Sequence, residues 1–391
     1  MPPLKSIETN VGKKNWLDAW HVSPSVNRDY DFIDGLRGIA ILMVVIGHHI
    51  YFNPKSGAFV HNIAGIFGVG GHGVTLFFAL SGFLISWPFW KLKVKGSKQV
   101  LPAGYGWRRF WKIYPPLALS ILVLTPVYIF FTADWSYVSI AGKWLAGLPF
   151  FIPVSGKLNP VMWTLVIEVQ FYILLPLLFV SLKRASPKVC LWLLTLLFLL
   201  VPVFVRVTTG FAPAFQPEIN SFFPSALDAF CAGIFVAGLE NLGVLEKKWA
   251  RLGVAGIILW ISSLLAIAWL NIHPQSRTFT VNEIVEDFSK IAAGCLLFFV
   301  ADPRHPITRL LCAPWLRWCG IISYEWYLFH QPILGWMRQS LGSAGGNVFK
   351  YAEIVGGSFL IGLMVAALLY RFFSLPLLKY GRAKNRPAHS Q

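Results

Sequence analysis

Charged side chains are scarce in this sequence. They make up 13% of its residues, whereas hydrophobic residues make up 56%, and a soluble globular chain carries about 25% charged residues. This shortage argues against a soluble domain with a single core. Apolar runs near 20 residues recur from Phe32 to Phe373, and each is long enough to cross a hydrocarbon layer of about 30 Å as a helix. The sequence therefore predicts an all-α, polytopic transmembrane helical bundle.

Cysteine is rare as well, and no pair has the CxxC spacing of a metal site or redox motif. We expect the cysteines to be small core residues, and we expect no bound metal. The five are Cys190, Cys231, Cys295, Cys312 and Cys319. The sequence also lacks a Walker loop and a GxGxxG motif, so an ordinary nucleotide-binding fold is not indicated. The first thirty residues contain no apolar run before a small-residue cleavage site, and we expect no signal peptide.

Acidic residues are half as frequent as basic ones, 17 against 34, which gives a net charge of +17. A nucleic-acid partner would need this charge on one solvated face. Most Lys and Arg instead fall in the segments that alternate spans place on one side of a membrane. This is the positive-inside asymmetry, so we expect cytoplasmic termini, no nucleic-acid partner, and a multi-pass location in a membrane.

Hydropathy and turn residues predict about ten spans. They are residues 33–52, 73–90, 113–131, 163–181, 189–206, 221–239, 252–271, 284–300, 318–339 and 352–372. We expect residues 1–32 to form a cytoplasmic segment, 33–373 the membrane domain and 374–391 a cytoplasmic tail. The stretch Trp144 to Pro153 is too short to span and is expected to dip into the outer interface. No internal repeat is evident, which weakens the inverted-repeat plan of many transporters.

The first span carries an Arg and a His eleven residues apart. Arg37 follows Asp34 near its start and His48 stands near its end, so both share one helix face, roughly 16 Å apart along the axis. An Arg at this edge can also be a snorkelling anchor, and a His within a span can also be a packing residue. Because ionisable groups within a membrane are costly, we expect both to be functional.

The fourth span places Glu168 about two turns from its outer end, followed by Tyr172. Since the first span runs outward and the fourth inward, His48 and Glu168 are expected at similar depths. A carboxylate beside an imidazole can orient the ring and raise its basicity. The alternative is a structural Glu that is hydrogen-bonded to neighbouring helices.

The segment before the third span is the most basic in the chain. Arg108, Arg109, Lys112 and Tyr114 interleave with aromatic residues there. Cations at a membrane mouth can hold the phosphates of a cofactor while aromatic rings stack on its base. Membrane orientation and contact with lipid phosphates are the alternative role of each residue.

Further polar groups occur in two spans. The ninth contains Tyr324, Tyr327 and His330, of which the last two are neighbours on one helix face. The second begins with a glycine-rich segment that includes His72. We expect these residues, together with Tyr172, to bind substrate or support the site by hydrogen bonds.

Taken in order, these motifs resemble the acyltransferase family 3 integral membrane proteins. The opening Asp34-Gly35-Leu36-Arg37-Gly38 with its His48, the segments 73–84, 163–172 and 323–332, and Asp228 to Gly233 all look family-like. The resemblance implies ten core helices, a cytoplasmic acyl-CoA donor, and a catalytic role for His48 with Arg37. Two positions depart: Thr75 stands where many members carry an acid, and Lys112 stands where the basic pair usually has a second Arg.

The resulting hypothesis is an integral membrane O-acyltransferase. Acyl-CoA, with acetyl-CoA expected, would dock its phosphates on Arg109, Lys112 and Arg108, and Arg37 would guide its arm to His48, oriented by Glu168. The acceptor would be a hydroxyl of a cell-surface or lipid-linked carbohydrate, and membrane lipid would be a further partner. The rivals are a proton-coupled exporter, with His48, Glu168 and His330 as a proton relay, and a non-catalytic binder of acyl lipids.

Overall fold

The computed structural model describes residues 16–21, 30–51, 70–152, 156–210, 227–276, 279–342 and 347–383. Regular secondary structure in these ranges is entirely helical. The α-helices are α1 (Asp31–Tyr51), α3 (Gly70–Val94), α4 (Tyr105–Thr132), α5 (Ser136–Leu145), α6 (Trp163–Ser181), α7 (Pro187–Gly210), α9 (Leu227–Asn241), α10 (Ala250–Ile272), α11 (Phe279–Leu296), α12 (Pro306–Leu311), α13 (Pro314–Ile321), α14 (Ser323–Leu341), α15 (Val348–Leu369) and α16 (Leu375–Ala383). Short 3₁₀ segments are η1 (Trp16–Trp20), η3 (Leu148–Phe150), η4 (Gly156–Leu158), η5 (Pro160–Met162), η8 (Lys247–Trp249), η9 (Pro274–Ser276) and η10 (Leu297–Ala301), and η11 (Tyr370–Ser374) is a π-helix.

Seven helical segments in the described ranges are long and apolar enough to cross a membrane. They are Asp31–Ile50, Gly70–Val94, Tyr105–Thr132, Pro160–Ser181, Pro187–Val205, Lys247–Ile272 and Val348–Arg382. The predicted helical membrane bundle is thereby confirmed, but length and composition do not reproduce the count of ten. Helices α9, α11 and α14 overlap the other three predicted spans, and the start of the span at 221–239 lies outside the described residues. Helix α14 is rich in polar residues but largely buried among other helices, so it needs no apolar surface.

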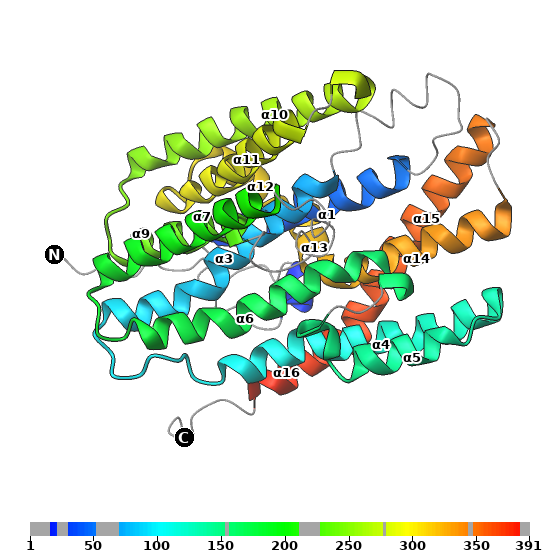
Figure 1. Ribbon diagram of the computed structural model, residues 1–391, viewed down its shortest axis with the longest axis horizontal. Helices are drawn as coiled ribbons and strands as arrows, with labels where there is room; N and C mark the ends of the chain where they lie inside the picture. Colours follow the sequence, from blue (N-terminus) through cyan, green and yellow to red (C-terminus); the bar gives the residue numbers. More distant parts are fainter. Residues whose placement is uncertain are drawn as a thin grey trace.

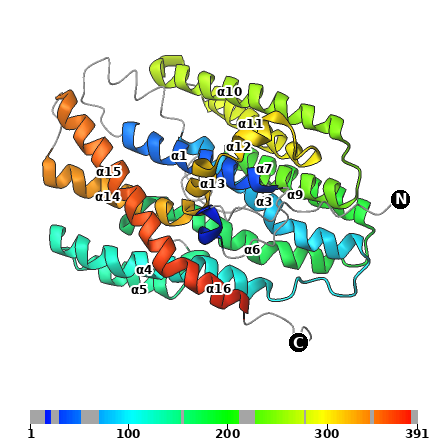
Figure 2. The same cartoon turned by 180° about the vertical axis from the view of Figure 1, so that it is seen from behind.

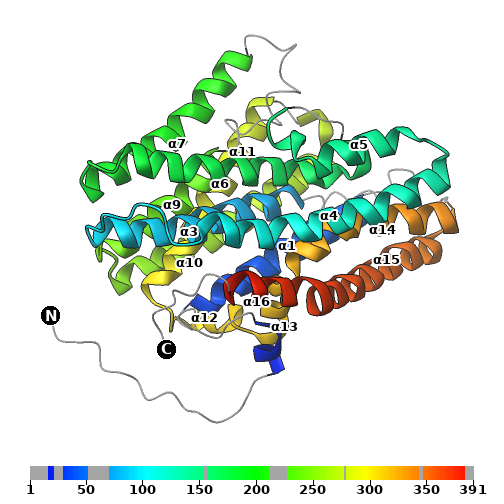
Figure 3. The same cartoon turned by 90° about the horizontal axis from the view of Figure 1, so that it is seen from below.

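The long helices run roughly side by side along the longest axis of the molecule (Figure 1). Helices α10 and α11 form one flank, α4, α5 and α16 form the other, and α1 and α3 lie between them. The opposite view shows α15 leading into α16 (Figure 2). Seen from below, α1 lies between α6 on one face and α12 and α13 on the other (Figure 3). Helix α1, which carries the first motif, is thus enclosed by other helices.

Close packing around α1 depends on the glycines of its opening motif. A Cβ atom at Gly35 would overlap the backbone oxygen of Leu311, and one at Gly38 would overlap that of Leu316. On the facing helix, a Cβ atom at Gly320 would overlap the backbone oxygen of Asp34. Because only glycine permits such an approach, the motif seats α1 directly against α12 and α13.

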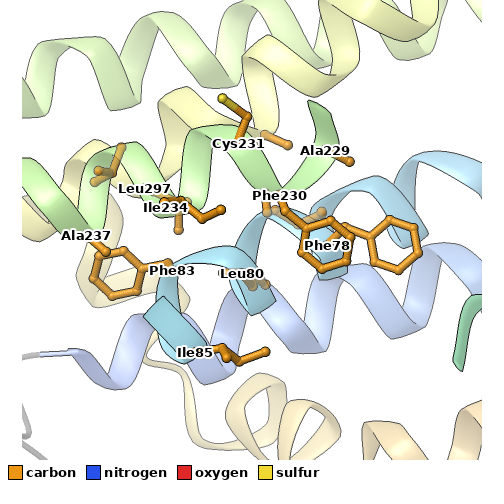
Figure 4. Close-up of a cluster of buried hydrophobic side chains, with 14 of the residues drawn as sticks. Phe78, Leu80, Phe83, Ile85, Ala229, Phe230, Cys231, Ile234, Ala237 and Leu297 are labelled. Carbon is orange, nitrogen blue, oxygen red and sulfur yellow. The ribbon is translucent and has the colours of Figure 1, made fainter. Parts of the chain in front are cut away.

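The apolar core is centred on α3 and α9. Phe78 of α3 stacks on Phe230 of α9 with ring centroids 4.8 Å apart, and Phe171 of α6 stacks on Phe230 at 4.2 Å. Figure 4 shows this cluster, to which α3 and α9 both contribute side chains. Offset aromatic pairs at such separations add to the burial term. The cluster holds the helices that surround the polar residues in fixed positions.

Cysteines take part in this packing as expected. Cys190, Cys231 and Cys319 are buried, and the thiols of all five cysteines are free. The buried three therefore behave as small hydrophobic core residues.

Some segments predicted as loops or tail are ordered helices. Residues 304–317 contain α12 and the first half of α13, which pack on α1, and a break at Ile322 separates α13 from α14. The short apolar stretch near Trp144 forms the end of α5 and η3 beside α4. Helix α15 continues through η11 into α16, which contacts α4. Residues 374–383 thus extend the bundle.

Candidate active site

Two imidazoles meet at the outer part of α1. The Nδ1 atom of His48 lies 2.9 Å from the Nε2 atom of His330 on α14, and the two rings stack with centroids 5.1 Å apart. His330 is fully buried and His48 is half-buried. An imidazole that is held by a partner and remains partly accessible can act as a base or a nucleophile.

The same two helices are linked again further inward. Arg37 of α1 donates a hydrogen bond of 3.0 Å from Nη2 to the hydroxyl of Ser323, the first residue of α14. Ser323 is buried. Because α1 and α14 both run outward from this level, the two contacts fix the depth of Arg37 relative to His48.

Other cations gather near Arg37. Lys112 of α4 experiences electrostatic repulsion from Arg37 and Arg109, and attraction to Glu168 and Asp34. Neither Lys112 nor Arg109 has a hydrogen bond or ion pair with an acidic side chain in the described part of the chain. We call Arg37, Arg109 and Lys112 the inner cation cluster. Positive groups held together without anionic partners form a ready site for an anion.

Aromatic rings hold the guanidinium of Arg109. Its carbon Cζ lies 5.8 Å from the ring centre of Tyr105 and 5.4 Å from that of Tyr172. Its Nε atom is buried without a hydrogen-bond partner. Cation–π contacts orient a guanidinium and leave its in-plane donors available to a ligand.

Glu168 belongs to this inner region. Its Oε1 atom accepts hydrogen bonds from the hydroxyls of Tyr172 and, at 3.1 Å, Ser81. No hydrogen bond joins Glu168 to His48 among the described residues, and the contact expected from their depths is not formed. His330 occupies the place beside His48 that the sequence reasoning gave to Glu168.

The remaining predicted residues lie outside these two groups or support them. Arg108 donates to the backbone oxygen of Ala103, and Tyr114 donates to that of Leu145 over 2.6 Å, so both side chains are engaged with backbone. The hydroxyl of Tyr324 donates to the backbone oxygen of Ile113 over 2.9 Å, which ties α14 to α4.

Two further contacts brace the outer region. The hydroxyl of Tyr327 donates to the backbone oxygen of Val161 over 3.0 Å and lies 2.8 Å from that of Thr164. The Nδ1 atom of His72 lies 2.6 Å from the hydroxyl of Ser289 on α11. His72 therefore links α3 to α11, and no hydrogen bond joins it to His48 among the described residues.

Sequence reasoning missed Asn159, which is fully buried. Its Nδ2 atom donates to the backbone oxygen of Leu328 over 2.8 Å. In a regular helix that oxygen would accept from residue 332, but Pro332 has no N–H. The signal was the proline inside α14, which leaves a carbonyl in need of a donor one turn earlier. Asn159 thus satisfies α14 directly beside His330.

His49 was also missed, although the His-His pair was visible in the sequence. Its Nδ1 atom lies 2.8 Å from the backbone oxygen of Val45, and its ring stacks on that of His330 at 6.2 Å. These contacts keep His49 against the pair. Across the described ranges, His, Cys, Asp and Glu side chains form no group of three that could hold a metal ion.

A family model described as an acyltransferase domain, that of acyltransferase family 3, matches residues 30–371. This chain belongs to the acyltransferase 3 family. The family match covers both the inner cation cluster and the histidine pair, and it confirms the resemblance found in the motifs. With seven helices able to span, it supports a multi-pass location in a bacterial inner membrane.

Two acyltransferase 3 relatives match over most of this chain. It is 28% identical over 376 residues to the peptidoglycan O-acetyltransferase OatA of Listeria monocytogenes, covering 89% of this chain and 56% of that protein. It is 24% identical over 379 residues to the O-acetyltransferase OatA of Staphylococcus aureus, covering 89% of this chain and 57% of that protein. The chain therefore spans less than two thirds of either relative. No solved structure matches it.

Proposed function

We propose that this chain transfers an acyl group, acetyl in the first instance, from cytoplasmic acyl-CoA to a hydroxyl of a cell-surface or lipid-linked carbohydrate. One observation carries the proposal: a single helix, α1, holds Arg37 beside the cations of α4 and His48 beside a buried imidazole partner. A residue that would bind an anionic donor and a residue that would act as the base therefore lie on one rigid helix. Rigid placement of the reacting groups lowers the barrier, because their orientation is fixed before the reaction begins.

The proposed binding of the acyl-CoA donor is argued from the positive charge of the inner cation cluster. Coenzyme A carries several phosphate negative charges at one end and its thioester at the other. Arg109 and Lys112 lie near the inner start of α4 without acidic hydrogen-bond partners, so phosphate oxygens would complete their hydrogen bonding. Arg37, held by Ser323, would mark the route of the pantetheine arm toward His48. Arg108 would contribute less, because its guanidinium faces backbone.

The chemical step rests on His48. The imidazole takes the proton of the acceptor hydroxyl, whose oxygen forms a bond to the thioester carbonyl carbon. The carbon–sulfur bond then breaks, and the proton passes from His48 to the departing thiolate, which leaves as free CoA. In the covalent variant a ring nitrogen of His48 bonds to the thioester carbonyl carbon and the carbon–sulfur bond breaks, so that CoA leaves as its thiolate. The acceptor oxygen then bonds to the same carbon as the carbon–nitrogen bond breaks, and the hydroxyl proton neutralises the charge of the thiolate. Both routes need a neutral His48 ring with an available lone pair.

The acceptor class is supported by the relatives, whose names include a peptidoglycan O-acetyltransferase. A carbohydrate hydroxyl reaching His48 from the outer side fits the position of this residue near the outer end of α1. Membrane lipid surrounds the exposed apolar faces of the bundle and is the second partner.

The test is release of free CoA by the purified full chain in detergent, given acetyl-CoA with a radiolabelled acetyl group and a panel of glycans. We expect label to reach one class of glycan with stoichiometric release of CoA, and we expect His48→Gln to abolish both. The Gln side chain keeps a polar group against His330, so packing is preserved. Full transfer by His48→Gln would overturn the proposal, and proton flux without CoA release would favour an exporter.

A further inference from the structure

The backbone of α14 determines which nitrogen of His330 carries a proton. Its Nδ1 atom lies 2.8 Å from the backbone oxygen of Tyr327 and 3.2 Å from that of Trp326. A carbonyl oxygen only accepts hydrogen bonds, so Nδ1 is the protonated nitrogen. His330 is fully buried, and a neutral ring in that position therefore has its lone pair on Nε2.

This assignment determines the state of the neighbouring ring. The Nε2 atom of His330 lies 2.9 Å from the Nδ1 atom of His48. Because His330 accepts at Nε2, His48 must donate from Nδ1. The lone pair of a neutral His48 then resides on Nε2, the nitrogen that makes no hydrogen bond with the described residues.

We infer that His330 is a positioning residue that fixes His48 in its Nδ1–H tautomer and leaves Nε2 of His48 as the reactive nitrogen. The catalytic consequence rests on the function proposed above, whereas the tautomer follows from the hydrogen bonds alone. The order is backbone carbonyl, His330, His48 and then acceptor hydroxyl. It repeats the arrangement in which a third group orients the base of a nucleophile–base pair.

The surroundings of His330 favour a fixed ring. The rings of His49 and Tyr327 lie 6.2 Å and 5.7 Å from it. Asn159 satisfies the carbonyl of Leu328, which Pro332 leaves without its helical donor, so the turn that holds His330 needs no water. When Nε2 of His48 takes a proton, His330 remains neutral and accepts the strengthened hydrogen bond from Nδ1–H.

The test compares His330→Gln with His330→Phe in the full chain. The Gln carbonyl can accept from Nδ1–H of His48, whereas Phe fills the space without an acceptor. The first readout is the ¹⁵N spectrum of protein labelled at its nine histidines, with the His48 signals assigned by their loss in His48→Gln. The second is the rate of acetyl transfer at saturating acetyl-CoA, together with its KM.

We expect wild-type His48 to show a protonated Nδ1 and an unprotonated Nε2. In His330→Phe this pattern is lost, and the saturated rate falls about 100-fold with little change in KM, as for a base in the wrong tautomer. In His330→Gln the pattern persists and the rate stays within about tenfold of wild type. The control is His49→Gln, which touches His330 but lies outside the hydrogen-bond chain, and its His48 spectrum is expected to be unchanged.

The inference is overturned if wild-type His48 is protonated on Nε2, or if His330→Phe leaves the Nδ1–H pattern intact. Thermal stabilisation by acetyl-CoA verifies that each variant is folded. A tautomer change in His330→Phe without any loss of transfer would support the positioning of the ring while contradicting the catalytic role proposed for His48. Failure of the inference and failure of the proposed function are therefore distinguishable.

Discussion

The two ends of α1 differ in how far their polar groups are satisfied. At the inner end, Arg109 and Lys112 lack acidic hydrogen-bond partners, and Arg37 is held by one neutral hydroxyl. At the outer end, His48 and His330 are hydrogen-bonded to each other and, through His330, to the backbone. The inner end is thus arranged to receive charge from a ligand, whereas the outer end is complete without one.

This difference separates binding from chemistry. Unpaired cations gain most of their interaction energy when an anion arrives, so their removal should weaken donor binding. A preorganised imidazole gains little from binding and acts in the transition state, so its removal should lower the rate. Four substitutions break or sharpen this contrast, beginning with the largest expected effect.

Arg109→Ala breaks the inner end alone. It removes one unpaired guanidinium, and loss of one or two charged hydrogen bonds to phosphate corresponds to a KM for acetyl-CoA about 10- to 100-fold higher, with the saturated rate little changed. Steady-state kinetics measure both. Arg108→Ala is the matched control, because its guanidinium faces the Ala103 carbonyl, and its KM is expected to rise less than threefold. Equal effects of the two would contradict the assignment.

Gly38→Ala disturbs both ends at once. A Cβ atom there would overlap the backbone oxygen of Leu316, which pushes α1 away from α13 and costs about 1–3 kcal/mol of stability. We expect a lower melting temperature, a higher KM and a lower rate together. Gly71→Ala is the control, since a Cβ atom at Gly71 meets nothing within 4 Å. A Gly38→Ala protein with normal stability and kinetics would refute the close contact.

Glu168→Gln sharpens the contrast by testing to which end this carboxylate belongs. The Gln side chain can still accept hydrogen bonds from Tyr172 and Ser81, but it removes one negative charge near Lys112. We expect the KM for acetyl-CoA to fall severalfold and the saturated rate to stay within tenfold. If Glu168 instead oriented His48, the rate would fall by orders of magnitude with KM unchanged.

Asp134→Asn changes a residue outside both ends of α1 and provides the baseline for effects on stability and kinetics. A hydrogen bond from Lys157, aided by Ser136, lowers the pKa of this partly exposed carboxyl to about 2. A lowered pKa stabilises the fold above the pKa of an unfolded Asp, about 3.9, and the effect is lost as pH falls toward 2. Exposed pairs contribute little, so melting temperature and kinetics at pH 7 are expected to match wild type. A clear loss of transfer would show that the outer loop reaches the site.

Much of the fold could be predicted from hydropathy, because membrane-spanning helices must be long and apolar. Length and composition alone identify seven spans among the described residues, and the other predicted spans fall on α9, α11 and α14. Helix α14 carries Ser323, Glu325 and His330 without reaching the apolar composition of a span, because neighbouring helices, rather than lipid, surround these residues. Residues near Leu316 were expected to be loop, yet they pack on the glycines of α1. Periodicity within one segment does not report which other segment approaches it.

Several predicted site residues lie near one another in the structure, but their hydrogen-bond partners differ from those expected. The spacing of Arg37 and His48 places both on one face of a helix, and a hydrogen-bonding role was expected for His330. Depth in the membrane alone could not decide whether Glu168 or His330 would contact His48, because either residue could lie at the depth of His48. Hydrogen bonds between distant helices decide it, and they depend on side-chain direction as well as depth. Asn159 shows the same limit, because its carbonyl partner lies 169 residues away in sequence.

The most direct test of the central claim is a paired measurement of acetyl-CoA affinity and single-turnover transfer rate for Arg109→Ala and His48→Gln. The affinity is predicted to fall in Arg109→Ala and to stay unchanged in His48→Gln. The transfer rate at saturating donor is predicted to stay near wild type in Arg109→Ala and to vanish in His48→Gln. A division of α1 into a binding end and a reacting end would be contradicted if both variants lost affinity for acetyl-CoA and kept the same transfer rate. It would also be contradicted if both variants lost transfer rate and kept the same affinity.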